Sequence, residues 1–266
     1  MKARCITLLA SLMVSACTPF APQDSAPSRT PTGNETQDAV PRDEPLSRRG
    51  NPPYYDQFGQ RYYVLKTAKG YNERGVASWY GKKFHGRQTS NGEIFDMYAM
   101  TAAHKTLPLP AYVEVTNLRN GKKAVLRVND RGPFVDNRII DLSYAAATKL
   151  GIVQDGTGLV EVRTIDASHP HEPLVATPKP KPVVAPSESA NIYIQVGAFS
   201  EETNAIRLHN RIRRQGISKV VIAVDTADAT AIHRVKVGPL KDVDELDKVS
   251  AELKRMGVQD TVLAFD

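Results

Sequence analysis

A proline-rich stretch divides the chain into two parts, each of which has the length of a small domain. Prolines recur between His169 and Ala190, at positions 170, 173, 178, 180, 182 and 186. Such sequences favour polyproline II, which rises about 3.1 Å per residue and would give a semi-rigid spacer on the order of 60 Å long. We therefore predict a linker over residues 167–190, between a first domain at 75–166 and a second at 191–266.

A second stretch, from Thr18 to about Pro53, is rich in Pro, Ser, Thr, Gln, Asp and Arg and has few large apolar residues. It cannot bury enough surface to offset the entropy lost on ordering, so we predict a disordered tether. Residues 54–74, which contain five tyrosines, are predicted to be a lead-in that packs on the first domain. With the cysteine at position 17, these segments occupy residues 17–74.

Residues 1–16 have the pattern of a lipoprotein signal peptide. Basic residues precede an apolar run, Ile6–Val14, that is too short to span a bilayer. The run closes on Val14-Ser15-Ala16-Cys17, which resembles a bacterial lipobox, so we expect export and lipidation at Cys17. Loss of Cys5 with the signal would leave Cys17 as the only thiol in an oxidising compartment.

Two or three acyl chains on Cys17 would give stable anchoring, because each buried methylene contributes about 0.8 kcal/mol. Thr18 stands where an aspartate would favour inner-membrane retention, so we expect the inner leaflet of the outer membrane, facing the periplasm. The alternative is an ordinary secretory signal with an incidental cysteine.

The charge of the chain suits an anionic polymer without specifying one. The formal net charge is +6, and removal of Lys2 and Arg4 with the signal leaves 6 − 2 = +4. Basic residues are spread along the chain, and nothing before residue 190 resembles a nucleic-acid module. We therefore expect no nucleic-acid partner.

The first domain is predicted to be a small closed barrel. Short strands are indicated at Gly75–Tyr80, Ala99–Ala103, Ala111–Thr116, Lys123–Val128 and Leu159–Arg163. One helix, Tyr144–Leu150, is expected between Ser143 as N-cap and Gly151 as the C′ residue. Asn120-Gly121 predicts a hairpin with a type I′ turn, in which both central residues have positive φ.

The second domain contains an internal repeat. Val196-Gly197-Ala198-Phe199 recurs as Val237-Gly238-Pro239-Leu240, which is 237 − 196 = 41 residues later. The predicted elements are, in order, a strand at Ile192–Phe199, a helix at Glu201–Gln215, strands at Val220–Val224 and His233–Val237, a helix at Val243–Met256 and a strand at Thr261–Phe265. The chain is therefore predicted to be mainly β, followed by a small α+β domain of βαββαβ order.

Four polar side chains of the first domain are candidates for catalysis: Glu93, Asp96, His104 and Asp130. Strand alternation would place Asp130 at the barrel mouth, on one face with apolar residues of its strand, a position that suits the acid of glycosidic cleavage. Glu93 and Asp96 would stabilise an oxocarbenium-like charge or assist the second proton transfer, and His104 would orient one of the carboxylates.

Each candidate also has a structural alternative. Glu93 fits a turn, Asp96 a local cap, His104 a satisfied core histidine, and Asp130 an ion pair with Arg131. A zinc site from His104 and the carboxylates lacks a short His or Cys pair to set the ligands. We therefore predict no metal and no cofactor.

Five long motifs run through the first domain: GVASWYG at 75–81, TSNGEIFD at 89–96, MTAAHKTLP at 100–108, VNDRGPF at 128–134 and IDLS at 140–143. They resemble the rare lipoprotein A family. The resemblance implies a six-stranded double-psi β-barrel and a lytic transglycosylase, which cuts glycan between N-acetylmuramic acid and N-acetylglucosamine and leaves a 1,6-anhydro end. By matching positions it implies a catalytic set of Glu93, Asp96, His104 and Asp130, with Asp130 as general acid and then base.

The repeat of the second domain resembles a SPOR domain, an RNP-like module that recognises peptidoglycan strands stripped of stem peptides at division sites. By that resemblance, Gln195, Phe199, Arg234 and Lys236 would lie on the sheet face that meets glycan. The alternative places Phe199 in the core and the basic residues on a solvated face. RNA recognition uses the same topology, but the aromatic pair typical of that use is missing.

Three functions remain open: a lytic transglycosylase, an expansin-like module that loosens glycan without cutting, and a structural septal protein localised by its second domain. The acidic candidates favour cutting, since an expansin-like binder would rely more on an exposed aromatic platform. Attack by water would instead make the enzyme a hydrolase. The expected partners are peptidoglycan strands without stem peptides, the membrane through Cys17, and septal division proteins.

Overall fold

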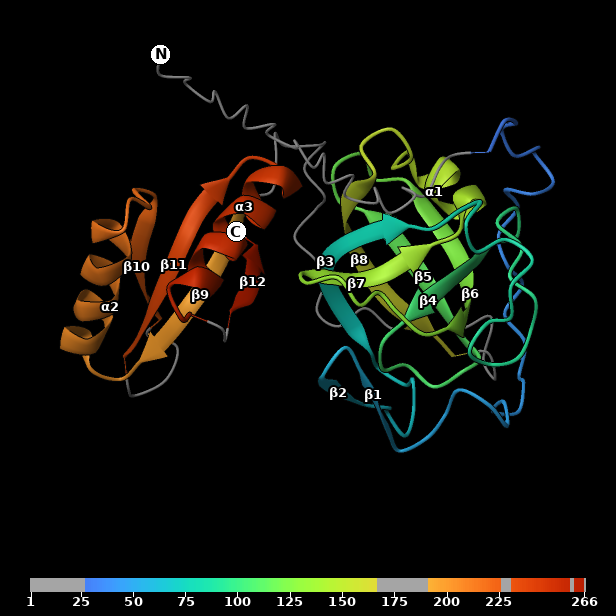
Figure 1. Ribbon diagram of the computed structural model, residues 1–266, viewed down its shortest axis with the longest axis horizontal. Coiled ribbons are helices and arrows are strands. Elements are labelled where there is room, and N and C mark those ends of the chain that lie inside the picture. Colours follow the sequence, from blue (N-terminus) through green and yellow to red (C-terminus); the bar gives the residue numbers. More distant parts are fainter. Residues whose placement is uncertain (1–26, 167–190, 226–230, 259–260, 266) are drawn as a thin grey trace, which may run out of the picture.

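The computed structural model describes residues 27–166, 191–225, 231–258 and 261–265, which form two domains (Figure 1). The predicted signal peptide, Cys17 and the predicted linker at 167–190 lie outside these residues. None of the helices in the described ranges is long and apolar enough to cross a membrane.

Six strands of the first domain close into a barrel in the order β3-β7-β4-β6-β5-β8, which confirms the predicted fold. The pairs β3/β7 and β4/β6 are parallel, and the other pairs are antiparallel. The strands are β3 Asn72–Trp79, β4 Thr101–His104, β5 Ala111–Asn117, β6 Lys123–Asp130, β7 Arg138–Leu142 and β8 Thr157–Ile165. Strand β7 is absent from the predicted set, because the consecutive Ile139 and Ile140 hide its alternation within five residues.

The barrel interior is filled by apolar side chains that alternate along the strands. Val113 and Val115 on β5 and Leu126 and Val128 on β6 are fully buried, whereas the residues between them are partly exposed. Burial of each such side chain contributes roughly 1.5–3 kcal/mol. The packed interior therefore fixes the ends of β4, β6 and β7, where the candidate residues lie.

Helix α1 (Tyr144–Leu150) follows β7, and both of its predicted caps are confirmed. Ser143 Oγ accepts a hydrogen bond from the Ala146 N–H at 3.2 Å, and Gly151 adopts a left-handed φ of 71°.

The hairpin between β5 and β6 forms, but the predicted type I′ turn is wrong. Gly121 has a φ of 70°, whereas the only described non-glycine residues with positive φ are Phe58 and Asn137. The Asn120 amide donates to the Leu150 carbonyl at 3.0 Å, and the Gly121 N–H donates to the Asn117 carbonyl at 2.8 Å. The Asn117 N–H donates to the Lys122 carbonyl at 2.8 Å, so a four-residue loop, 118–121, joins the two strands instead of a two-residue turn.

Residues 27–53 run along the barrel, so the predicted disordered tether is wrong for this part of the chain. The Val125 N–H donates to Asp38 at 2.7 Å, and the Ala39 N–H donates to the Val125 carbonyl at 3.0 Å. The Asn51 amide donates to the Leu109 carbonyl at 2.6 Å and accepts from the Leu109 N–H at 2.8 Å. This segment is held to the barrel mainly by specific hydrogen bonds and much less by burial of apolar side chains. Its polar composition therefore resembles that of a tether.

The lead-in contains a two-stranded hairpin of β1 (Tyr54–Gln57) and β2 (Gln60–Tyr63), labelled at the lower end of the barrel in Figure 1. It is attached to the loop after β4. The Tyr55 hydroxyl donates to the Lys105 carbonyl at 2.8 Å, and the Leu65 N–H donates to the Thr106 carbonyl at 2.8 Å.

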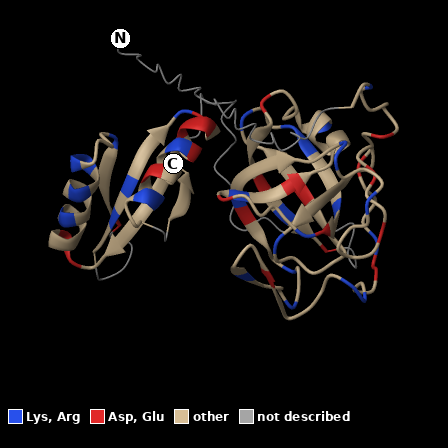
Figure 2. Ribbon diagram, in the orientation of Figure 1, with Lys and Arg blue, Asp and Glu red and all other residues tan. Residues whose placement is uncertain are grey.

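The second domain has the predicted βαββαβ order, with a sheet of strand order β10-β11-β9-β12. Its elements are β9 Ile192–Phe199, α2 Glu202–Arg214, β10 Val220–Asp225, β11 Ile232–Leu240, α3 Val243–Arg255 and β12 Val262–Phe265. Ala205 and Ile212 of α2 and Leu246 and Leu253 of α3 share one apolar core with the sheet. The outer side of α2 carries many of the domain's basic side chains (Figure 2).

Helix α3 contacts the barrel beside β7. Arg138 at the start of β7 pairs with Asp247 at 2.9 Å, and Lys254 pairs with Asp136 at 2.8 Å. The fully buried Val76 of β3 packs in the same apolar cluster as the core of the second domain.

Candidate functional site

Asp130 ends β6 and is held by a loop that crosses the outside of the barrel. Its Oδ1 accepts hydrogen bonds from the Ser90 N–H at 2.8 Å, the Ser90 hydroxyl at 2.6 Å and the Arg131 N–H at 2.8 Å. All three bonds end on Oδ1, and none of the hydrogen bonds in the described structure ends on Oδ2. Ser90 was not among the predicted site residues, although it lies inside the 89–96 motif.

The predicted position of Asp130 on one face with Leu126 and Val128 is wrong. The register of β6 against β4 shifts, so that Val128 pairs with Ala102 and Asp130 pairs with Ala103. One extra residue, Asn129, thus interrupts the alternation, as in a β-bulge. Asp130 consequently lies on the outer face of the barrel with Ala103, which packs in a separate cluster that includes Tyr80.

The alternative in which Asp130 serves only as an ion-pair partner of Arg131 is also wrong. The Arg131 guanidinium donates to the carbonyls of Gly50, His104 and Leu107 and to the Asn51 side chain. The Arg131 guanidinium therefore binds the N-terminal segment to the loop after β4, and its hydrogen bonds in the described structure go to these groups and not to the Asp130 carboxylate.

Asp141 is a second carboxyl beside Asp130, and it was not among the predicted candidates. It lies on β7 between the buried Ile140 and Leu142, so it points to the outer face, and it too pairs with Ala103. The Ser78 hydroxyl donates a short hydrogen bond to its Oδ1. Burial raises the pKa of Asp141, and the charge of Asp130 adds to this, against the opposing effects of Ser78, Arg138 and Lys105.

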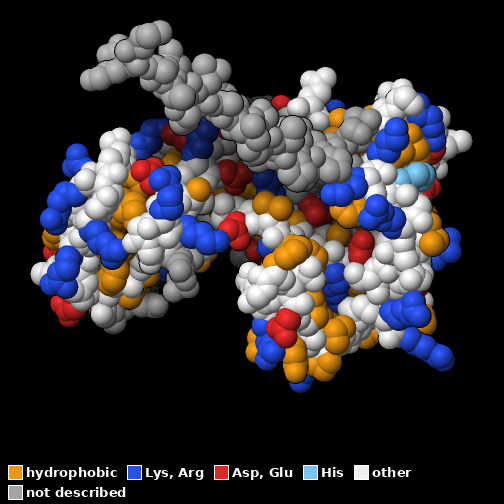
Figure 3. All heavy atoms as spheres, in the orientation of Figure 1, with side chains coloured by type: hydrophobic (Ala, Val, Ile, Leu, Met, Phe, Trp, Pro, Cys, Tyr) orange, Lys and Arg blue, Asp and Glu red, His pale blue; other side chains and the backbone are white. Residues whose placement is uncertain are grey.

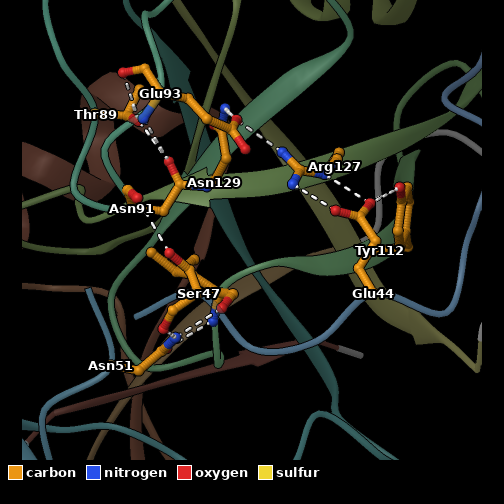
Figure 4. Close-up of polar contacts among 10 residues, drawn as sticks. Glu44, Ser47, Asn51, Thr89, Asn91, Glu93, Tyr112, Arg127 and Asn129 are labelled. Atoms are coloured by element: carbon orange, nitrogen blue, oxygen red, sulfur yellow. Dashed lines mark hydrogen bonds and ion pairs between the residues drawn. The ribbon is translucent and has the colours of Figure 1, made fainter. Parts of the chain in front are cut away.

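Glu93 lies on the same outer loop as Ser90, next to β6 (Figure 4). Its Oε2 accepts from Arg127 and from the Asn129 amide, both at 2.8 Å. Burial alone would raise the pKa of Glu93, but the hydrogen bonds from Arg127 and Asn129 outweigh it and hold the pKa below its usual value. Glu93 is thus an anion at neutral pH, which suits stabilisation of a positive charge and not proton donation.

Arg127 is itself fixed by the N-terminal segment. Glu44 accepts from the Arg127 guanidinium at 3.0 and 2.7 Å, and the Tyr112 hydroxyl donates to the same carboxylate (Figure 4). The segment that composition assigned to a tether therefore contributes to the electrostatics of the site.

Asp96 is exposed, and its contacts in the described structure are local. Its Oδ1 accepts from the Tyr98 N–H at 2.9 Å and lies 3.6 Å from His85 Nδ1. This matches the alternative of a local cap, and no contact joins Asp96 to Asp130 or Glu93.

His104 is buried at the end of β4 and does not orient any of the candidate carboxylates, so that prediction is wrong. Its Nδ1 accepts from the Thr106 and Leu107 N–H groups at 3.1 and 3.0 Å. The ring proton therefore belongs on Nε2, which lies 2.8 Å from the Tyr71 hydroxyl, and that hydroxyl donates to Glu73 at 2.5 Å. Burial, with the charges of Arg131 and Lys105, lowers the pKa of His104 to about 3.

No group of three or more His, Cys, Asp or Glu side chains in the described part of the chain is placed to hold a metal ion. The site as described is a set of carboxyls fixed by hydrogen bonds on a rigid barrel, which suits acid–base chemistry.

The open face of the second-domain sheet brings together three of its four predicted residues. Gln195 pairs with Lys236 across β9 and β11, and Arg234 Nη1 donates to Gln195 Oε1 at 3.4 Å. Tyr193, which alternates with Gln195, lies on the same face with its ring 5.4 Å from the Lys236 ammonium. The sequence analysis missed Tyr193, although two-residue spacing from Gln195 was the available signal.

The predicted position of Phe199 on this open face is wrong. The register of β9 against β11 shifts between the pairs Gln195–Lys236 and Gly197–Val235, so Val196 is an extra residue. Beyond this bulge the faces exchange, and Phe199 packs against the apolar core, close to Gly197 and Leu208.

Comparison with known proteins gives the family. A lytic transglycolase model matches residues 72–163, and a SPOR domain model matches residues 188–264. The endolytic peptidoglycan transglycosylase RlpA of Vibrio cholerae is 45% identical over 234 residues, which cover 88% of this chain and 84% of that protein. The chain belongs to the RlpA family.

Two further RlpA comparisons cover different extents. RlpA of Pseudomonas aeruginosa is 34% identical, over 92% of this chain and 91% of that protein. The crystal structure of the RlpA SPOR domain from the same organism matches with 25% identity and a TM-score of 0.26, over 27% of this chain and 96% of that one. The transglycolase model begins at residue 72, so the hairpin β1–β2 and the segment with Glu44 precede the part that defines the RlpA barrel.

Proposed function

We propose that the chain is an endolytic peptidoglycan transglycosylase that breaks the β-1,4 bond from N-acetylmuramic acid to N-acetylglucosamine and leaves a 1,6-anhydro end. The observation that carries this proposal is the pair of carboxyls, Asp130 and Asp141, next to the Glu93 anion on an RlpA-family barrel. Two neighbouring carboxyls can share one proton, and burial together with the charge of Asp130 raises the pKa of the Asp141 carboxyl.

The chemistry proceeds in two proton transfers. First, Asp130 gives a proton from Oδ2 to the glycosidic oxygen while the C1–O bond breaks, and the N-acetylglucosamine leaves with a free 4-hydroxyl. Positive charge then develops on C1 and the ring oxygen. Next, the Asp130 carboxylate removes the proton of the 6-hydroxyl as O6 bonds to C1. The acid is regenerated and no water is consumed, since the 6-hydroxyl is already tethered near C1.

The neighbouring residues support these transfers in different ways. Asp141, whose pKa is raised by burial and by the charge of Asp130, shares the single proton of the pair, and that proton passes to the glycosidic oxygen through Asp130 Oδ2. Glu93 is the fixed anion that stabilises the developing positive charge. Asp96 accepts a backbone hydrogen bond within the outer loop, and His104 accepts one at the end of β4. Both residues therefore stabilise the backbone that positions the site.

The second domain directs this activity to its substrate. Gln195, Arg234 and Lys236, with Tyr193, bind glycan strands that lack stem peptides, and such strands concentrate the enzyme at the division septum. Lipidated Cys17 anchors the chain in the inner leaflet of the outer membrane, where septal division proteins are further partners. The support for this part is the SPOR domain match and the polar, aromatic open face.

A second candidate function is an expansin-like module that binds and loosens glycan without cutting. The exposed aromatic side chain at the tip of the β1–β2 hairpin favours it, since Phe58 is 83% exposed. It differs from the first candidate in one respect that can be measured, which is whether any glycosidic bond is broken.

The test is mass spectrometry of soluble products after incubation of the lipid-free mature chain with intact sacculi and with amidase-treated sacculi. Anhydro-ended fragments, released mainly from the amidase-treated strands, are expected. Reducing ends would identify a hydrolase. Tight binding to both substrates without any release would identify the expansin-like function and overturn the proposal.

A further inference from the structure

A cluster of aromatic side chains lies beside the proposed cleavage site, and most of its members belong to the β1–β2 hairpin, which precedes the part of the chain that the transglycolase model matches. Tyr55 and Tyr62 stack at 5.3 Å on one face of the β1–β2 hairpin, and Phe134 meets both rings at 6.2 and 5.7 Å. Phe58 at the hairpin tip joins Phe134 at 6.1 Å. In Figure 3, hydrophobic side chains gather at this lower end of the barrel.

The hairpin tip holds an aromatic ring that the turn does not need. Phe58 and Gly59 have φ values of 50° and 78°, the left-handed pair of a type I′ turn. Asn or Gly is preferred at such a position, whereas a bulky side chain is strained there by an energy on the order of 1 kcal/mol. The ring is nevertheless 83% exposed, so it adds little to the core.

The aromatic face continues into the surroundings of Asp130. A cavity of about 340 Å³ is lined by Tyr55, Gln57 and Phe134 together with Ser90 and Arg131. Ser90 is the residue whose N–H and hydroxyl hold the Asp130 carboxylate. Phe134 follows Asp130 by 134 − 130 = 4 residues on the same loop. A polymer bound at Asp130 therefore has this aromatic face directly beside it.

We propose that this face, made of Tyr55, Phe58, Tyr62 and Phe134 with Gln57 at its edge, is a saccharide subsite that binds N-acetylhexosamine rings next to the scissile bond. Aromatic rings offer flat apolar surfaces for the C–H faces of a sugar, and the Gln57 amide can bond to hydroxyl or N-acetyl groups. The opposite face of the hairpin carries Tyr54 and Tyr63, since neighbouring residues of a strand point to opposite sides. This inference rests on the proposed function, because its ligand is the strand that is cut.

The experiment uses two substitutions that separate the two faces. Phe58→Asn removes the ring and keeps a residue that favours the left-handed turn, so the hairpin is preserved. Tyr63→Ala removes an exposed ring from the opposite face of the same hairpin and serves as the matched control. Both are made in the lipid-free mature chain, and the barrel's folding is followed through Trp79, the only tryptophan.

The expected result is a roughly three- to tenfold higher KM for amidase-treated glycan strands in Phe58→Asn, with kcat little changed. Tyr63→Ala should behave as the unmodified chain. Equal KM values in all three proteins would overturn the subsite while leaving the proposed function intact.

A binding measurement separates failure of the subsite from failure of the proposed function. Retention on the same strands is measured in an Arg234→Ala, Lys236→Ala background, which removes the contribution of the second domain. Absent turnover with retention that Phe58→Asn weakens would overturn the cutting activity and keep the subsite as part of a glycan binder. Absent turnover with retention unchanged by Phe58→Asn would overturn both.

Discussion

Asp130 and Asp141 lie on the two strands that flank β4, and both pair with the same residue of that strand, Ala103. Adjacent strands are about 4.8 Å apart, so the two backbones are separated by roughly 10 Å, and side chains on the shared outer face can reach toward each other. The parallel β4/β6 pair and the antiparallel β4/β7 pair bring together residues that are 141 − 130 = 11 apart in the chain. The topology of the barrel thus builds the carboxyl pair.

Asp130→Asn should abolish bond cleavage and leave the fold intact. The amide oxygen can still accept from Ser90 and from the Arg131 N–H, but it can neither give nor take the proton. A loss of about 10²- to 10⁴-fold in the release of anhydro-ended fragments is expected. Asp155→Asn, at an exposed carboxylate paired with Arg119, is the matched control. Undiminished release by Asp130→Asn would remove Asp130 from its proposed role.

Asp141→Asn should shift the pH dependence of cleavage more than its maximum rate. The charge of Asp130 raises the pKa of Asp141, and in the proposed mechanism the two carboxyls share one proton. Without the charge of Asp141 the pair gives up its catalytic proton more readily, so the alkaline limb of the pH–rate profile should move to lower pH. An unchanged profile would show that Asp141 is not coupled to the reaction.

The same substitution should change stability with a defined sign. The pKa of Asp141 is raised in the folded state, so its contribution to stability is fully present below the unfolded pKa, near 3.8, and is lost as pH rises through the folded pKa. Asp141→Asn cannot ionise. The difference in unfolding free energy between the two proteins should therefore move in favour of Asp141→Asn as pH rises, which urea unfolding followed by Trp79 fluorescence would measure.

Arg127→Gln should make cleavage fail at mildly acidic pH. The pKa of Glu93 is held down by Arg127 and Asn129 against the effect of burial, so loss of the guanidinium should let Glu93 become protonated at higher pH. The acid limb of kcat/KM is then expected to move upward in Arg127→Gln. Arg119→Gln, at an exposed ion pair, should leave that limb in place. Identical limbs in both variants would exclude Glu93 as the stabilising anion.

On the second domain, Arg234→Ala and Tyr193→Ala should weaken retention on amidase-treated glycan, because both side chains lie on the open face. Phe199→Ala should instead lower the stability of this domain by about 1–3 kcal/mol, since its ring packs on the core. Pull-down and thermal unfolding of the same samples separate the two effects. Lost retention in a Phe199→Ala protein of unchanged stability would restore Phe199 to the binding face.

Alternation and capping predicted most of the fold, and they failed where one residue breaks a period. The caps of α1 and most of the strands of both domains follow local signals, so they can be derived from the sequence. Asn129 and Val196 are single extra residues in otherwise regular strands. Each bulge exchanges the two faces of its strand, which is why Asp130 and Phe199 lie on the opposite side from the one predicted.

The candidate site was predictable only in part, because its contacts join distant segments. His104 binds Tyr71, which is 33 residues away, and Arg127 binds Glu44, which is 83 residues away. Neither pairing leaves a local pattern. The motif at 140–143 includes Asp141. Its position beside Asp130 follows from the pairing of β4 with β7, and β7 was not among the predicted strands.

His104 should make the barrel sensitive to acid. Its folded pKa of about 3 lies below the usual 6.5, so its contribution to stability is present above pH 6.5 and is lost as pH falls toward 3. The slope from this group approaches about 1.4 kcal/mol per pH unit in that window. His104→Gln cannot take up a proton, so its stability, although lower at neutral pH through the lost bonds to Thr106, Leu107 and Tyr71, should depend less on pH between 6.5 and 4.5. Parallel urea curves at several pH values, read through Trp79, test this. An equal pH dependence in both proteins would mean that His104 becomes charged in the folded barrel, which two backbone donors on Nδ1 forbid.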